Sequence, residues 1–457
     1  MGIPGQSVAR LMDRATRELN SLHSFMLLRH GQVAAEFWWH PYAPEHPHLL
    51  FSLSKSFTAT AIGLAIADGL LTIDDPVIRF FSREQLPDNP SANLQAMTIR
   101  HLLTMTSGHD QCALASGNTA QFPNDWAQQI LAQPVVYPPG TQFVYNSGAT
   151  HLLSAILHAV TGIHLLDYLG PRLLAPLGII GARTETSPNG IHIGGWGMSL
   201  KTEDIAKFGQ LYLQHGRWGD RQLIPAQWVK AATACQVPCA LGDQADWQEG
   251  YGYQFWRARH NAFRGDGAFG QFCLVLPDQD TVVAITAGLQ NMQQVLDLIW
   301  EELLPNLQSE RISVTEPVQF PEMCLPKAGG ASASPLTAQF NGRRWKLSEN
   351  PGLFSHVTFH FTESGVTLEF AAAATTETLT AKYGDWSVGQ IRLENDAPRR
   401  YAASAGWAKP DELQLHICCY EQPFTIELRC LFTQNHLTLE MKFNVAWRCT
   451  WPTVQGE

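Results

Sequence analysis

The stretch Phe51-Ser52-Leu53-Ser54-Lys55-Ser56-Phe57-Thr58 places a serine and a lysine three residues apart at the start of an apolar segment. Three residues make slightly less than one turn of an α-helix, so the Ser52 hydroxyl and the Lys55 amine can share a face. The backbone N–H groups of the first helical turn have no partner within the helix. We therefore interpret Ser52 as a candidate nucleophile beside a candidate proton acceptor.

The helix predicted for residues 52–68 carries apolar side chains around its whole circumference, from position 57 to position 66. This pattern is typical of a helix that is buried on all sides. A lysine on such a helix has few ways to reach water. The pattern therefore disfavours the alternative in which Ser52 only caps the helix and Lys55 lies on the surface.

The chain has 457 residues, more than one hydrophobic core usually supports. Helical segments followed by two strands at 272–276 and 281–286 predict an α+β domain over residues 1–307. Residues 308–334 hold few apolar runs and a Gly/Ala/Ser stretch, which favours a linker. From 335 to 457, short runs alternate apolar and polar residues, which predicts an antiparallel β domain that can close as a barrel.

Composition excludes some classes of partner and compartment. The net charge of -10 disfavours nucleic acids and anionic membranes, because both require a basic face. No segment of membrane length is free of charges and helix breakers. The nine cysteines show no paired spacing, and we expect buried free thiols in a reducing compartment. Without a basic region followed by an apolar core at its start, the chain is predicted to be cytoplasmic.

A second segment, residues 138–148, reads Pro-Pro-Gly-Thr-Gln-Phe-Val-Tyr-Asn-Ser-Gly. It predicts a turn and then a short strand that ends at Tyr145, just before another helix. Tyr145 and Ser147 are two residues apart, so on an extended backbone their side chains point to the same side. Both can then face one cleft. The alternative for Tyr145 is a half-buried packing role.

A third segment, residues 263–271, reads Phe-Arg-Gly-Asp-Gly-Ala-Phe-Gly-Gln and matches the pattern Gly-x-Gly-x-x-Gly. A dinucleotide-binding fingerprint must follow a strand and open a helix, whereas here a strand follows the glycines. We therefore reject nucleotide binding. Glycines on an edge strand instead allow a substrate carbonyl to approach backbone N–H groups.

Histidines gather ahead of Ser52, at His40, His46 and His48. Their spacing fits no zinc-ligand pattern with a fourth partner, so we expect solvated loop histidines and no metal. His109, which follows a Ser-Gly turn together with Asp110, is a candidate for substrate contact.

Together the three segments resemble the serine β-lactamase and penicillin-binding-protein superfamily, in its class C-like branch of esterases and 6-aminohexanoate-dimer hydrolases. The resemblance covers roughly residues 20–305, and segments 102–108 and 194–198 also carry it. It implies an α domain packed on an α/β domain with a central antiparallel sheet. The active site of that fold lies in the cleft between the two, and no cofactor is implied.

The resemblance also implies the role of each candidate residue. Ser52 is the nucleophile, Lys55 and Tyr145 share the role of general base, and the N–H groups of Ser52 and Ala268 form the oxyanion hole. Burial should lower the pKa of Lys55, and a nearby cation should favour a tyrosinate at Tyr145. The further candidates for substrate binding are Ser147, Gly265, Asp266, Gly267, His109 and Trp196.

The sequence departs from the family pattern in two places. Ser147 stands where the family usually has asparagine, and Gly265 stands where it has a lysine or histidine. Without that cation, binding of a β-lactam carboxylate is weakened, and Asp266 should repel an anionic substrate. Arg264 is adjacent, but on a strand its side chain should face the other way. These departures favour small esters or linear amides as substrates.

The sequence therefore predicts a serine hydrolase that cleaves a small ester or amide through an acyl-enzyme on Ser52. Two alternatives stay open: a β-lactamase or D-amino-acid peptidase, and a catalytically silent binding protein on the same fold. For residues 335–457, three roles stay open: to cap the cleft, to mediate a homodimer or to bind a ligand.

Overall fold

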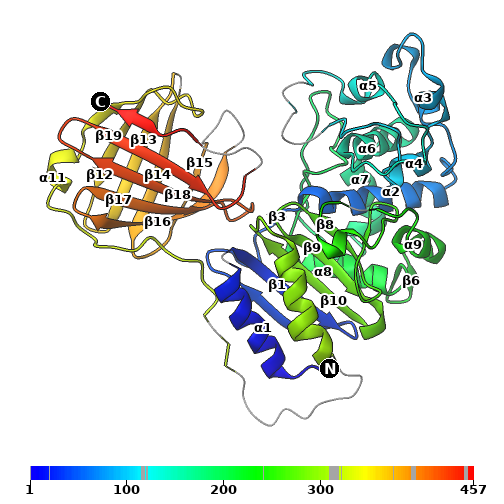
Figure 1. Ribbon diagram of the computed structural model, residues 1–457, viewed down its shortest axis with the longest axis horizontal. Helices are drawn as coiled ribbons and strands as arrows, with labels where there is room; N and C mark the ends of the chain where they lie inside the picture. Colours follow the sequence, from blue (N-terminus) through cyan, green and yellow to red (C-terminus); the bar gives the residue numbers. More distant parts are fainter. Residues whose placement is uncertain are drawn as a thin grey trace.

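Two β-sheets organise the chain, a six-stranded sheet built by its first part and a ten-stranded sheet built by its last part (Figure 1). This arrangement confirms the predicted α+β fold, with a C-terminal sheet that is antiparallel except where residues 382–383 and 404–405 pair in parallel. The computed structural model describes residues 2–19, 21–114, 119, 122–239, 241–307, 319–320, 322–373, 375–392, 398–446 and 451–457.

The first sheet is antiparallel and has the strand order β2-β1-β10-β9-β8-β7. Strands β1, β8, β9 and β10 are buried along their whole length because helices cover both faces. The strands are β1 (Leu22–Arg29), β2 (Gln32–Trp38), β7 (Trp256–Arg257), β8 (Phe263–Gly267), β9 (Gln271–Leu276) and β10 (Thr281–Ala287).

Side chains of β1 alternate between the two faces of this sheet, as the period of a strand requires. Phe25 packs on the face covered by α1 and α10, and Met26 packs on the face covered by α2 and α8. These helices are α1 (Gly5–Glu18), α2 (Ser54–Ala67), α8 (Thr202–Leu213) and α10 (Gln293–Leu298).

A helical region is inserted between β2 and β7, and α2 packs there against α6. Its other helices are α3 (Ala92–Ala96), α4 (Ile99–Leu103), α5 (Trp126–Leu131), α6 (Ser147–Thr161), α7 (Leu165–Leu169) and α9 (Ala226–Thr233). The short strands are β3 (His48–Leu49), β4 (Ser199–Leu200), β5 (Arg217–Trp218) and β6 (Arg221–Gln222). Single-turn helices are η1 (Phe51–Leu53), η2 (Val77–Phe80), η3 (Arg83–Gln85), η5 (Gly170–Leu174), η6 (Ala245–Trp247), η7 (Pro277–Gln279), η8 (Ile299–Leu303) and η9 (Leu304–Asn306).

The strand predicted to end at Tyr145 does not form. Residues 142–146 run without a ladder partner, and the Val144 N–H donates to Met105 O at 2.9 Å. The segment passes directly into α6, where the Asn146 side chain accepts hydrogen bonds from the N–H groups of Gly148 and Ala149. Two hydrogen bonds to Met105, from the N–H groups of Val144 and Asn146, thus replace the expected strand pairing.

The second sheet has the order β11-β12-β13-β14-β16-β17-β18-β19-β20, with β15 paired to β16. The Lys346 N–H, in β11, donates to Glu457 O beside β20 at 2.9 Å, so the two ends of the sheet meet in a barrel-like form. The strands are β11 (Arg344–Lys346), β12 (His356–Phe361), β13 (Gly365–Ala371), β14 (Thr376–Tyr383), β15 (Ser387–Ile391), β16 (Arg399–Lys409), β17 (Glu412–Cys418), β18 (Thr425–Phe432), β19 (Leu437–Phe443) and β20 (Val454–Gly456), after a short helix α11 (Thr337–Phe340).

Aromatic side chains fill the inside of this barrel-like sheet, which forms a core of its own. Trp345, Phe359 and Phe432 are buried there and contact one another. The domain boundaries at 307 and 335 stay predictions, and residues 308–318 and 321 of the predicted linker lie outside the described residues.

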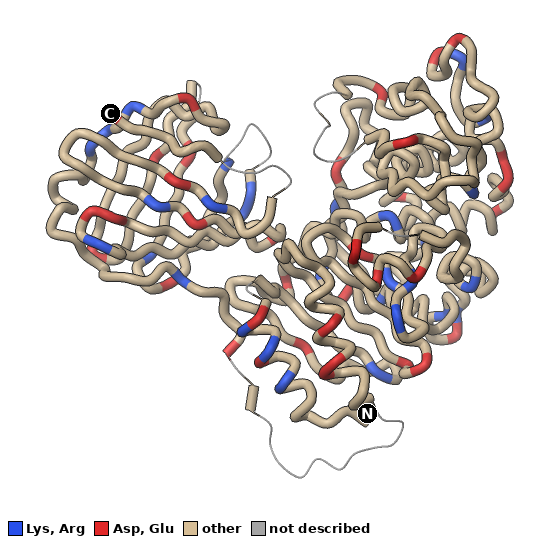
Figure 2. Tube along the Cα trace, in the orientation of Figure 1, with Lys and Arg blue, Asp and Glu red and all other residues tan. Residues whose placement is uncertain are grey.

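Charged residues of both signs are interspersed over the two parts of the molecule (Figure 2). Within the described residues, no single helix has the length and apolarity needed to cross a membrane. The bent pair Ser147–Thr161 and Leu165–Leu174 meets that criterion only when its two helices are counted together.

Candidate active site

The amine of Lys55 lies at the centre of a buried polar cluster. Ser52 is in η1, Lys55 is in the first turn of α2, and only 1% of the lysine is exposed. Its Nζ donates to Ser52 Oγ at 3.0 Å, to Ser147 Oγ at 2.9 Å and to Gly195 O at 2.6 Å. The structure thus brings together the nucleophile and base expected from the sequence, and adds a backbone carbonyl.

These three contacts suit both protonation states of Lys55. An ammonium has three N–H donors, and the cluster offers three acceptors. The neutral amine has two N–H donors and one lone pair, so one neighbour must reverse and donate. Gly195 O can only accept, whereas the hydroxyls of Ser52 and Ser147 can do either. When Ser52 is the one that donates, its proton already points at the base.

Burial lowers the pKa of Lys55 from 10.5 to about 7, because the desolvated ammonium is disfavoured. Cys112 and Asp266 lie close enough to oppose this shift. Near neutral pH a substantial fraction of Lys55 is therefore the free amine, as the sequence led us to expect.

Tyr145 lies on the other side of the same amine. Its ring centroid is 4.9 Å from Lys55 Nζ, and its hydroxyl is hydrogen-bonded to Ser52. Burial raises the pKa of Tyr145 well above 10, and the Asp266 carboxylate adds to this effect. This shift runs against the tyrosinate expected from the sequence, because it keeps the phenol protonated near neutral pH. The shared role of Lys55 and Tyr145 as general base stays a prediction.

The N–H groups of Ser52 and Ala268 belong to two segments that pack tightly together. Gly267, the last residue of β8, approaches η1 so closely that a Cβ there would collide with Leu50 O. Ser52 is the second residue of η1, so its N–H has no acceptor within that helix, and in the described part of the chain neither this N–H nor that of Ala268 donates to another segment. Two donors without partners on adjoining segments are what an oxyanion hole requires.

Alternate residues of β8 face opposite ways. Gly265 packs on Leu53 and Ser56, and a Cβ at this position would already be too close to both side chains. The lysine that the family usually carries there therefore has no room. Arg264 and Asp266 face the other side and form a buried ion pair, with Nε and Oδ2 3.1 Å apart.

This ion pair corrects the expectation for Asp266. Because Arg264 compensates its charge, Asp266 does not present a lone carboxylate that would repel an anionic substrate. Arg264 is fully buried, stacks on Trp247 with 4.4 Å between the guanidinium carbon and the ring centroid, and donates to backbone carbonyls, as its direction on the strand predicted. The contacts of Arg264 therefore fix β8 in place and leave its guanidinium buried within the protein.

Two candidates for substrate contact, His109 and Trp196, are buried. His109 is 2% exposed, and its Nδ1 shares a hydrogen bond with Ser107 Oγ. Trp196 is buried, and its Nε1 donates to Glu185 Oε2 at 3.2 Å. These contacts tie His109 to its own turn and Trp196 to Glu185, and a role of either residue in substrate contact stays a prediction.

Of the histidines ahead of Ser52, His40 is exposed and His46 is half-buried, but the expectation for His48 is wrong. His48 is not solvated: it is 3% exposed, and its Nε2 lies 3.1 Å from Nδ1 of the buried His23. It begins β3, which pairs with β4 and is covered by the last part of the chain. Among the described residues, no group of three or more histidine, cysteine or acidic side chains could hold a metal ion.

Sequence reasoning missed several residues of this cluster. Gly195 O was not predicted as an acceptor, although its glycine-rich segment carried the resemblance. Asn146 holds the loop beside the site by accepting from Ala113 N at 2.9 Å, and Cys112 accepts from Ser147 N at 3.3 Å. Only the position of Asn146 just before a helix could have signalled its capping role.

The model of one protein family, Beta-lactamase, matches residues 20–302. The chain belongs to the beta-lactamase family. The match ends close to the point where the helices of the first part end, and it includes every residue of the Lys55 cluster. The predicted membership in the superfamily is thus confirmed, and the chain is a beta-lactamase-family hydrolase.

Similar proteins span different shares of this beta-lactamase-family chain. The 6-aminohexanoate-dimer hydrolase of Paenarthrobacter ureafaciens is 28% identical over 309 residues, which are 61% of this chain and 78% of that protein. The beta-lactamase of Escherichia coli K12 is 24% identical over 190 residues, 36% of this chain and 47% of that protein. The octameric penicillin-binding protein homologue from Pyrococcus abyssi has a similar fold over 99% of both chains, with a TM-score of 0.54 and 16% identity.

Proposed function

We propose that the protein is a serine hydrolase that cleaves a small ester or amide through an acyl-enzyme on Ser52. The observation that carries this proposal is the 3.0 Å contact between Ser52 Oγ and the buried amine of Lys55. A free amine at this distance can take the hydroxyl proton as oxygen attacks the substrate carbonyl. The similarity to a 6-aminohexanoate-dimer hydrolase supports a linear amide or ester as substrate.

In this mechanism the Ser52 and Ala268 N–H groups bind the carbonyl oxygen as it gains negative charge. Lys55 takes the Ser52 proton, and a proton then passes from Lys55 through the Tyr145 hydroxyl to the leaving group as its bond to the acyl carbon breaks, which leaves Lys55 neutral and Tyr145 protonated again. A water molecule then attacks the acyl-enzyme, Lys55 accepts the water proton, and that proton returns to Ser52 Oγ as the acid product leaves. The Ser147 hydroxyl can accept a hydrogen bond from Lys55 in both protonation states, which leaves the single lone pair of the neutral amine free for the Ser52 proton.

The surroundings of β8 favour cleavage of a small ester or amide over the β-lactamase and D-amino-acid peptidase alternatives. The position of the family's carboxylate-binding cation is Gly265, and Leu53 and Ser56 fill the space beside it. The adjacent Arg264 is fully buried and paired with Asp266. Among the described residues of β8, no cation is free to bind a substrate carboxylate.

Labelling tests the proposal directly. A fluorophosphonate probe should label the wild-type protein on the peptide that contains Ser52, as mapped by mass spectrometry, and should not label Ser52→Ala. Fluorescent penicillin should label neither protein. If the fluorophosphonate leaves the wild type unlabelled, the chain is catalytically silent; penicillin label on Ser52 would instead favour the β-lactam alternative.

The pH dependence of turnover should report the state of Lys55. Below about pH 7 the ammonium has no lone pair to accept the Ser52 proton, and above it the free amine does, so kcat/KM for a p-nitrophenyl ester should rise with pH around 7. Tyr145→Phe should lower the rate but keep the midpoint, because Tyr145 titrates far above this range. A midpoint in the range of an ordinary carboxylate would contradict the assignment of Lys55 as base.

A further inference from the structure

The C-terminal domain packs against the residues that flank both oxyanion donors. Phe51 comes just before Ser52, and Phe269 comes just after Ala268. Their rings are 5.6 Å apart and share a cluster with Leu49 and with Val445 from the end of β19. Phe424, which precedes β18, lies 6.3 Å from the Phe51 ring and 5.9 Å from the Phe269 ring.

Phe51 and Phe269 both have backbone conformations that residues other than glycine rarely adopt. The φ angle is 46° at Phe51 and 69° at Phe269, in the left-handed region. Such conformations persist only where the surroundings hold them in place. Here part of that support comes from the C-terminal domain, through Phe424 and Val445.

Leu49, three residues before Ser52, is held at both ends of its backbone. Its N–H donates to Glu421 O of the C-terminal domain at 2.8 Å. Its carbonyl accepts from His48 Nδ1 at 3.0 Å. The C-terminal domain therefore contributes directly to the position of the strand that leads to the nucleophile.

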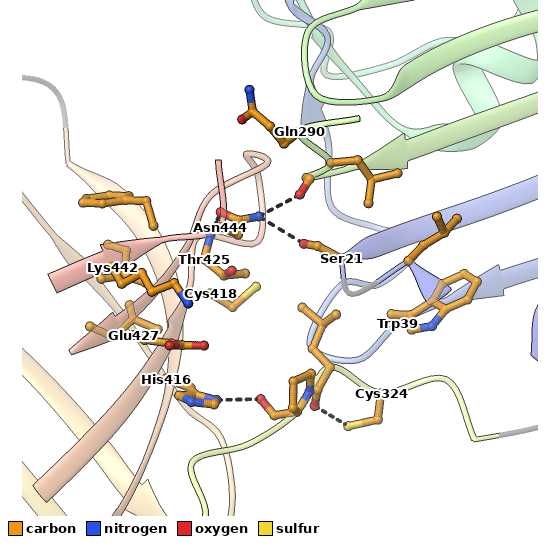
Figure 3. Close-up of a pocket in the computed structure, with 18 of the residues that line it drawn as sticks. Ser21, Trp39, Gln290, Cys324, His416, Cys418, Thr425, Glu427, Lys442 and Asn444 are labelled. Carbon is orange, nitrogen blue, oxygen red and sulfur yellow. Dashed lines mark hydrogen bonds between the residues drawn. The ribbon is translucent and has the colours of Figure 1, made fainter. Parts of the chain in front are cut away.

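The second of these contacts is the end of a chain of hydrogen bonds that starts in the C-terminal domain. Asn444 Nδ2 donates to Ser21 Oγ at 3.1 Å, Ser21 Oγ is 2.9 Å from His23 Nε2, and His23 Nδ1 is 3.1 Å from His48 Nε2. Figure 3 shows Asn444 reaching across to Ser21 at the edge of a cavity of about 730 Å³ between the two parts of the molecule.

If both imidazoles are neutral and His48 Nδ1 carries the proton, the bonds of this chain all run in one direction. Leu49 O accepts, so His48 Nδ1 must donate, and His48 Nε2 must then accept from His23 Nδ1. His23 Nε2 in turn accepts from the Ser21 hydroxyl, which accepts from Asn444. Both imidazoles must be neutral for this to hold; burial keeps the pKa of His48 at about 4 and that of His23 well below 6.5.

We propose that the C-terminal domain holds the oxyanion hole in its working shape, with Phe424 and Asn444 as positioning residues. Phe424 supports the two phenylalanines that flank the donors, and Asn444 orients Leu49 through Ser21, His23 and His48. The effect on turnover rests on the proposed serine hydrolase function. The effect on the two backbone segments does not.

Replacing Phe424 should therefore lower turnover without weakening substrate binding. For Phe424→Ala we expect kcat for a p-nitrophenyl ester to fall about tenfold or more, with KM within about twofold. The oxyanion donors act mainly in the transition state, so misplacing them affects kcat more than KM. Phe424→Leu, which keeps most of the apolar contact, should recover most of the rate. Hydrogen–deuterium exchange of residues 48–53 and 267–270 should rise in Phe424→Ala.

The hydrogen-bond chain predicts that effects at Asn444 and Ser21 do not add. Ser21→Ala should lower kcat severalfold. Asn444→Ala also removes the hydrogen bonds from Asn444 Nδ2 to Gly288 O and Pro423 O, but adding Ser21→Ala to it should lower kcat no further, because both substitutions break one chain. Tyr42→Phe is the matched control: it removes the 2.8 Å hydrogen bond from Tyr42 to Gln422 O at the same interface but leaves the chain intact. It should keep the wild-type kcat.

Phe370→Leu controls for a general loss of stability, because Phe370 is buried in the core of the barrel-like sheet, away from Phe424. It should lower the melting temperature without raising exchange at residues 48–53 and 267–270. Equal exchange of those segments in wild type and Phe424→Ala would overturn the proposal, whether or not the enzyme is active. A wild type that turns over no ester and takes no fluorophosphonate would overturn the proposed function alone.

Discussion

Replacing Lys55 by methionine should lower kcat for a p-nitrophenyl ester by about a hundredfold or more, the usual contribution of a positioned general base. Methionine is similar in length to lysine and fills the same buried space, but it has no amine to accept the Ser52 proton. KM should change little, because the hydrogen bonds of Lys55 go to groups of the protein itself, namely Ser52, Ser147 and Gly195 O. Steady-state kinetics with the two purified proteins measure the effect.

Two controls separate the loss of the base from a loss of folding. Lys207→Met changes a lysine of α8 that pairs with Glu203, and it should leave kcat unchanged. The melting temperature of Lys55→Met should not fall steeply, because burying an amine is costly and the variant removes that cost. A Lys55→Met enzyme with near wild-type kcat would remove Lys55 from the mechanism.

Gly267→Ala should lower kcat almost as much as Lys55→Met does, although it adds only one methyl group. The new Cβ would collide with Leu50 O and lie 3.2 Å from Leu53 N, so β8 and η1 must move apart. That movement separates the Ser52 and Ala268 N–H groups, and loss of one oxyanion donor typically costs about a hundredfold or more in kcat. Overpacking should also lower the free energy of unfolding by about 1–3 kcal/mol.

Gly170→Ala provides the matched control, because a Cβ at Gly170 would have no heavy atom within 4 Å. This variant should keep both the wild-type kcat and the wild-type melting temperature. If Gly267→Ala also retained wild-type kcat, the close approach of β8 to η1 would have no part in shaping the oxyanion hole.

The prediction for Tyr145 shows which features of the site a local sequence pattern can predict and which it cannot. An extended segment places Tyr145 and Ser147 on one side, and both do contact the Lys55 amine. The segment is nevertheless no strand, because whether an extended chain finds a ladder partner depends on distant residues. The tyrosinate expected at Tyr145 is also disfavoured, because burial of the phenol raises its pKa and the nearby Asp266 carboxylate adds to that effect.

The sequence by itself determined the helix that pairs Ser52 with Lys55, the family, and the alternating strands of the C-terminal domain. Each of these follows from spacings of a few residues, which the fixed geometry of helices and strands converts into positions in space. Only the tertiary structure decided that Gly195 O binds the lysine, that Arg264 neutralises Asp266, and that Phe424 and Asn444 reach the nucleophile loop. These contacts join segments far apart in the chain, and they arise only when whole cores pack together.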